Sequence, residues 1–158
     1  MDAQKNSEIL KGAGITGFIN AIINGGIQYF FLKDKAPIAL SVDSITNTEE
    51  TVLGSSVGVA LSLAMILTVV AYFSIKDAKV TFFPTAFWLT IKHGFFTFGV
   101  IVAMAVMWQK YMGTVEVSLV TALVVIGIIA GVVAGVVNYL TLRGCIISDT
   151  VKKQAINE

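Results

Sequence analysis

Hydrophobic and polar positions along the chain alternate between long apolar runs and short polar segments. Four apolar runs stand out, at residues 12–32, 53–73, 87–108 and 117–140. About 20 apolar residues are needed for a helix to cross the hydrocarbon core of a bilayer, so each run is long enough for one span. The pattern predicts an all-α integral membrane protein, a four-transmembrane-helix bundle forming a single domain of residues 1–158. Residues 33–52 are then a loop on one side of the membrane, and residues 141–158 a polar tail on the other.

Composition supports a membrane location. The chain is 56% apolar and only 13% charged, with a mean hydropathy of +0.83. Too few polar side chains are present to cover a water-facing surface, whereas a lipid bilayer suits such a chain. The net charge is +1, and no aromatic-basic patch occurs, so we expect no nucleic-acid partner. A single cysteine and a single histidine give no internal disulfide and none of the usual zinc spacings, and we expect neither a metal nor a cofactor.

The basic residues are distributed unevenly between the two sides that four spans define. Those on the side of the termini are Lys5, Lys11, Lys76, Lys79, Lys92, Arg143, Lys152 and Lys153, and those on the other are Lys33, Lys35 and Lys110. By the positive-inside rule both termini are cytoplasmic and the loop at 33–52 is extracytoplasmic. The outline is that of small bacterial four-span proteins, so we expect the bacterial inner membrane.

A weak internal repeat relates the two halves of the chain. A shift of 69 residues places Phe18, Asn24 and Gly25 over Phe87, His93 and Gly94, and a shift of 67 places Ala60, Ala64, Thr68 and Tyr72 over Gly127, Gly131, Gly135 and Tyr139. Both hairpins would run in the same direction, which indicates a parallel repeat about the membrane normal.

Small residues recur at every fourth position in two of the runs. The last run carries Gly127, Gly131 and Gly135, and the second carries Gly54, Gly58 and Ser62. Lipid provides no hydrophobic drive for helix association, so helices in a membrane depend on close backbone approach and on hydrogen bonds. These seams are predicted to pack helices within one chain, between subunits of a homo-oligomer or membrane complex, or both.

Three amides in the first run, Asn20, Asn24 and Gln28, are spaced four residues apart and form one stripe on a helix. An amide that faces hydrocarbon has no hydrogen-bond partner, which is costly, so the stripe is predicted to turn away from lipid. Two interpretations remain open: the amides bond to neighbouring helices as adhesive groups, or they line a hydrated seam for a polar solute or ion.

The third run contains Lys92 and His93. If Trp88 and Trp108 sit in the two interfacial belts, both residues lie about one turn inside the cytoplasmic edge, where Lys92 can extend to the headgroups. His93 lies nearer the face of Thr90 and Thr97 and can point into the bundle. Together with Asn138 in the last run, Thr90, His93 and Thr97 complete the candidate polar seam.

No catalytic constellation is evident. All ten carboxylates lie outside the apolar runs or at their edges, and no phosphate loop, HExxH motif or nucleophile elbow occurs. We therefore expect a protein that is not an enzyme. Two functions remain: a conduit for a small polar or ionic solute, or a non-catalytic structural or assembly subunit of a membrane complex, docking through the acidic residues of the outer loop.

Overall fold

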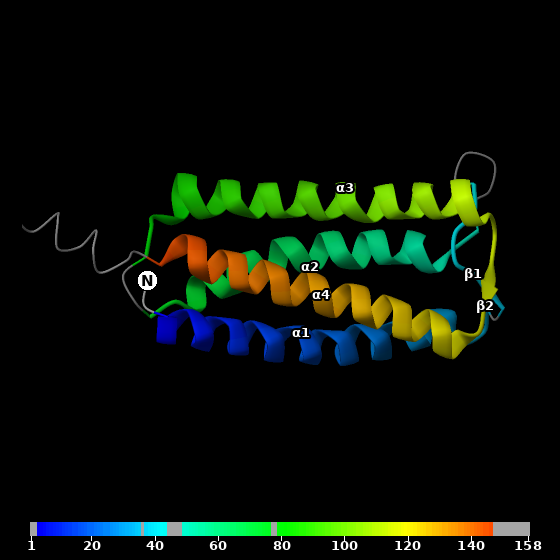
Figure 1. Ribbon diagram of the computed structural model, residues 1–158, viewed down its shortest axis with the longest axis horizontal. Helices are drawn as coiled ribbons and strands as arrows, with labels where there is room; N and C mark the ends of the chain where they lie inside the picture. The colour runs from blue at the N-terminus through cyan, green and yellow to red at the C-terminus, as the bar shows by residue number, and fades with distance from the viewer. Residues whose placement is uncertain (1–2, 36, 44–48, 77–78, 147–158) are drawn as a thin grey trace, which may run out of the picture.

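The computed structural model describes residues 3–35, 37–43, 49–76 and 79–146. Within these residues there are four long helices, α1 (Ala3–Leu32), α2 (Val52–Ser74), α3 (Phe87–Met112) and α4 (Leu119–Cys145). Each helix runs in the direction opposite to the helix before it in the chain (Figure 1). Each lies in a segment long and apolar enough to cross a membrane. The predicted all-α four-helix architecture is confirmed.

The helices are arranged in the order α1, α4, α2, α3 rather than in a closed ring. The central pair is α2 and α4; α1 packs on α4 at one edge and α3 packs on α2 at the other (Figure 1). The first hairpin is α1 with α2, and the second is α3 with α4. If α1 is exchanged with α3 and α2 with α4, the same three pairs of helices are in contact. A parallel repeat of two helical hairpins accounts for this order.

Several helix ends differ from the sequence prediction, α3 among them, which ends at Met112 instead of 108. The first helix begins at Ala3, well before residue 12. Ile9 in this additional part is buried, as is Ala13 just after it, and the backbone of Ala13 lies beside Gly135 on α4. The last helix begins at Leu119 rather than 117, since Glu116–Val117 forms a short strand, β2. It continues to Cys145, so the first residues of the predicted tail are helical. Residues 147–158 lie outside the described part of the chain.

The outer loop at 33–52 is tied to the end of the bundle. Its strand β1 (Ile38–Ala39) pairs antiparallel with β2, and the backbone N–H of Leu40 donates to the carbonyl of Val115 at 2.8 Å. Ile38 and Leu40 are buried in an apolar cluster with Leu32, Val52, Leu53, Ala122 and Ile126. The described part of this loop is therefore a cap packed on the helices, and not an extended arm.

At the opposite end of the bundle lie the start of α1 and the end of α4 (Figure 1). A π-helical turn, η1 (Phe82–Ala86), leads into α3, and the backbone N–H of Val80 donates to the carbonyl of Cys145 at 3.0 Å. Tyr72 on α2 donates its hydroxyl hydrogen to the carbonyl of Val80 at 2.9 Å. The two ends of the described chain thus lie on one side, as four spans require. That this side is cytoplasmic stays a prediction.

Candidate functional site: polar groups in the helical layer

The glycines of α4 bring α1 into close backbone contact. A Cβ atom added to Gly17 on α1 would lie 2.7 Å from the carbonyl oxygen of Gly131, and one added to Gly127 would lie 3.0 Å from the oxygen of Ala21. One at Gly135 would lie 3.2 Å from the oxygen of Ala13. The predicted seam of α4 therefore packs helices within the chain.

The small residues of α2 have a different position. Gly54, Gly58 and Ser62 are exposed on the outside of the layer, and a Cβ at Gly58 would meet open space. Among the described residues no helix covers this seam. Its predicted role in packing, within the chain or between chains, stays untested.

The amide stripe of α1 lies beside the glycine seam. Asn20, Asn24 and Gln28 are all half-buried. The side-chain nitrogen of Asn20 donates to the carbonyl of Thr16, and that of Asn24 donates to the carbonyl of Asn20, both at 2.9 Å. One N–H of each of these two amides is therefore bonded within its own helix, and the second N–H has no acceptor among the described residues.

The oxygens of the same amides have no such partner. Within the described parts of the chain, no hydrogen bond reaches the side-chain oxygen of Asn20 or Asn24, and Gln28 makes no side-chain hydrogen bond. Asn138 on α4 is likewise half-buried and without a side-chain hydrogen bond to a described residue. These are half-buried polar groups in apolar helices, without a hydrogen-bond partner for those atoms among the described residues.

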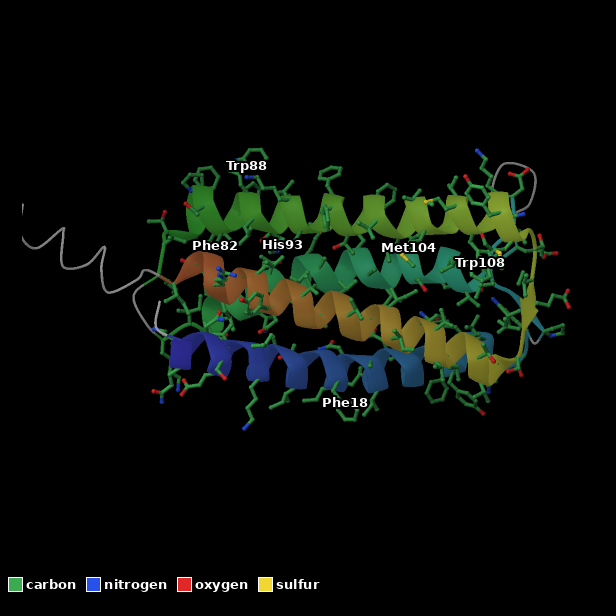
Figure 2. All side chains as sticks on the ribbon, in the orientation of Figure 1. Phe18, Phe82, Trp88, His93, Met104 and Trp108 are labelled. Atoms are coloured by element: carbon green, nitrogen blue, oxygen red, sulfur yellow. The ribbon has the colours of Figure 1, made fainter. Side chains whose placement is uncertain are left out.

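A second polar group lies between α2 and α3. Thr90, His93 and Thr97 share the face of α3 that is buried, with exposed fractions of 7%, 9% and 7%. His93 Nδ1 lies 2.8 Å from the hydroxyl oxygen of Thr68 on α2, which is completely buried. Figure 2 places His93 between Trp88 and Trp108, nearer to Trp88.

The hydrogen bonds of Thr68 define the tautomer of His93. The Thr68 hydroxyl donates to the carbonyl of Ala64 at 2.6 Å, so its single hydrogen is already used. It can only accept from the histidine, and the ring must carry a hydrogen on Nδ1. In the neutral ring Nε2 is then an acceptor, for which the described residues provide no hydrogen-bond donor.

His93 and Thr97 line a cavity of about 220 Å³ between α3 and α4. The remaining lining is apolar, for example Ile101 on α3 and Val133 and Val137 on α4. The cavity is large enough for a few water molecules or a small solute, and the two polar side chains are the only groups in its lining that could orient one.

The residues of the predicted polar seam form two groups instead of one. Asn20, Asn24 and Gln28 lie on α1 at one edge of the layer, whereas Thr90, His93 and Thr97 lie on α3 at the other, with α4 and α2 between them (Figure 1). Asn138 belongs to α4.

Sequence reasoning missed Thr68, the partner of His93. The internal repeat had already grouped Thr68 with Ala64 and Ala60, which lie four and eight residues earlier on the same helix face and are buried. A single hydroxyl side chain on a helix face of small, buried residues was the signal that could have identified it.

The protein is, by the length and apolar character of its helices, an integral membrane protein of four spans. Comparison with protein-family models, with curated proteins and with solved structures gives no match.

Proposed function

We propose that the chain is a non-catalytic subunit of a membrane assembly, joined to its neighbour through the amide flank of α1, which comprises Thr16, Asn20, Asn24 and Gln28. The supporting observation is that the side-chain oxygens of Asn20 and Asn24 receive no hydrogen bond from the described residues, although they sit within an apolar helix. Leaving such groups in hydrocarbon is unfavourable, so a covering surface with hydrogen-bond donors is favoured.

A second copy of the same chain is the neighbour that suits this flank best. An amide is both donor and acceptor, so a stripe of amides is self-complementary, as a two-fold interface requires. Each interhelical hydrogen bond of this kind contributes about 0.6 kcal/mol and at most about 2 kcal/mol in a membrane. Three amides at successive turns add enough for a weak but specific association.

The open order of the helices also favours assembly. The edge helix α1 packs mainly on α4 and leaves Ile15, Ile19 and Ile23 exposed. The outer loop, which we considered as a docking surface, packs on its own bundle through Ile38 and Leu40. These loop side chains are therefore used within the chain, whereas the amide flank of α1 is available to a neighbour.

The mass of the protein in mild detergent tests this function. We expect the wild type to be a dimer or larger species and Asn24→Leu to be shifted to the monomer. Ile22→Leu, an apolar exchange at an exposed position of the same helix, is the matched control and should keep the wild-type mass. A monomeric wild type at every protein concentration, or an unchanged mass for Asn24→Leu, would contradict it.

A second function, passage of a small polar or ionic solute, is favoured by one separate observation. His93 and Thr97 line the cavity between α3 and α4, and the Nε2 atom of His93 has no donor among the residues that the structure describes. A solute or water could use that acceptor in place of its hydration shell.

Flux through proteoliposomes distinguishes this second function from assembly. For a conduit, His93→Phe should abolish the permeation of water or small ions while the mass in detergent stays unchanged. Lys92→Gln, one residue away and exposed on the outside of α3, should retain the flux. A wild type no more permeable than protein-free vesicles would exclude the conduit.

A further inference from the structure

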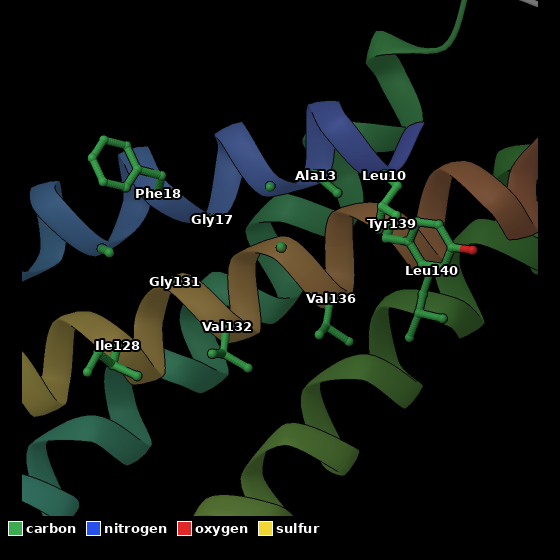
Figure 3. A pocket seen from close by; sticks show the side chains of 13 residues that line it. Leu10, Ala13, Gly17, Phe18, Ile128, Gly131, Val132, Val136, Tyr139 and Leu140 are labelled. Atoms are coloured by element: carbon green, nitrogen blue, oxygen red, sulfur yellow. The ribbon is translucent and has the colours of Figure 1, made fainter. Parts of the chain in front are cut away.

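An open apolar groove runs between α1 and α4. Its volume is about 540 Å³, and Figure 3 shows it bordered by Phe18 and Leu10 on α1 and by Ile128 and Leu140 on α4. Gly14, Gly17, Gly131 and Gly135 are among its lining residues, and they have no side chains to fill it.

The length of the groove corresponds to one leaflet of a bilayer. From Ile128 to Leu140 a helix rises about 18 Å, slightly more than half of the roughly 30 Å hydrocarbon core. On α4 the groove therefore extends over about half of a span, in the part of the helix nearer Cys145. One acyl chain of one leaflet fits this length, whereas a transmembrane helix of a partner would continue across both leaflets.

Positive charge lies at the membrane-surface end of the groove. Tyr139 lies beside Leu10 at this end (Figure 3), and its hydroxyl accepts a hydrogen bond from Nη1 of Arg143 at 3.2 Å. Arg143 is one turn beyond Tyr139 and exposed, and no carboxylate in the described part of the chain pairs with it. Lys11 on α1 shares a helix face with Gly14 and Phe18 and is also exposed.

We infer that this groove is a binding site for a lipid with an anionic phosphate headgroup, one acyl chain lying between α1 and α4 and the phosphate bound by Arg143. The guanidinium keeps several donors beyond the one given to Tyr139, and its fork geometry matches phosphate oxygens. Tyr139 fixes its position, because its own hydroxyl hydrogen is donated to Oδ1 of Asn6 at 3.1 Å. Lys11 adds a second cation on the other wall.

This inference is independent of the proposed assembly, because none of the four residues of the amide flank lines the groove. Filling the groove tests it without touching the flank. A Cβ at Gly14 would meet open space, so Gly14→Leu fills the groove without pushing α1 from α4. Gly12 is equally open but does not line the groove, which makes Gly12→Leu the matched control.

The experiment reconstitutes each variant in vesicles of equimolar phosphatidylglycerol and phosphatidylcholine and counts the lipids retained on release into detergent by native mass spectrometry. We expect the wild type and Gly12→Leu to retain one phosphatidylglycerol. Gly14→Leu and Arg143→Gln should each retain it about tenfold less often. Lys92→Gln, an exposed cation on α3, should behave like the wild type.

Four outcomes would overturn the inference. Equal retention of phosphatidylcholine would mean that no anion is recognised, and equal retention by Gly14→Leu would mean that the groove is not the site. A lower mass of the detergent complex for Gly14→Leu but not for Gly12→Leu would mean that a helix of a second copy occupies the groove. Competition by free glycerol phosphate, without acyl chains, would identify a soluble phosphate as the ligand instead of a lipid.

Discussion

The contact between Gly17 and Gly131 should be the position at which one added methyl group disturbs the structure most. A Cβ at Gly17 would lie 2.7 Å from the backbone oxygen of Gly131, whereas ordinary contact begins near 3.4 Å. Gly17→Ala must therefore move α1 away from α4 by about 0.7 Å, since neither backbone can rotate out of the way.

The energetic cost follows from what this shift does to the rest of the seam. A gap of 0.5–1 Å removes about a quarter to a half of the dispersion energy of each atom pair it separates. Gly127 with Ala21 and Gly135 with Ala13 lie in the same interface and lose contact together. We expect Gly17→Ala to lower the free energy of unfolding by about 1–3 kcal/mol, the usual range for overpacking.

Unfolding in mixed micelles with increasing SDS, followed by far-ultraviolet circular dichroism, measures this cost. The matched control is Gly25→Ala, which also faces α4 but has its nearest neighbour, the oxygen of Leu123, at an ordinary 3.6 Å. Gly25→Ala should be neutral or slightly stabilising, because alanine favours helix over glycine by up to about 1 kcal/mol. If both variants unfold at the same SDS fraction, the seam does not depend on close backbone approach.

Two further predictions concern α2 and α4. Thr68→Val removes the acceptor for His93 Nδ1 and should lower the free energy of unfolding by about 1–3 kcal/mol, because a buried N–H is left without a partner. The control is Thr97→Val, which should lower the free energy of unfolding clearly less, because the Thr97 side chain makes no hydrogen bond within the described residues. Equal losses for the two variants would contradict the assigned hydrogen bond. Cys145 is completely buried in the cluster with Tyr72 and Ala86, so it should resist permeant and impermeant maleimides alike until the protein is denatured. The orientation of the protein in the membrane is then better measured in the double variant Cys145→Ser, Lys76→Cys. Position 76 is exposed, and its new cysteine should react only from the cytoplasmic side. Rapid labelling of native Cys145 would show that the end of α4 is open.

The sequence predicted the polar side chains of the candidate sites but not their grouping. Asn20, Asn24 and Gln28 do share a half-buried stripe, and Thr90, His93 and Thr97 do share a buried face, because a helical period alone determines both sets. That the two sets lie at opposite edges depends on α1 packing on α4 and α3 on α2. Helical periodicity is the same for every order of neighbours, so it could not indicate this.

The sequence by itself determined that the chain has four membrane-spanning helices, because span length and hydropathy are local properties of each segment. It also determined which faces are small or polar. Only the tertiary structure decided which face meets which: the glycines of α4 against α1, Thr68 against His93, and Gly58 against no described helix. The physical reason is that association in lipid depends on steric fit between two particular backbones, and fit is a property of the pair rather than of either sequence.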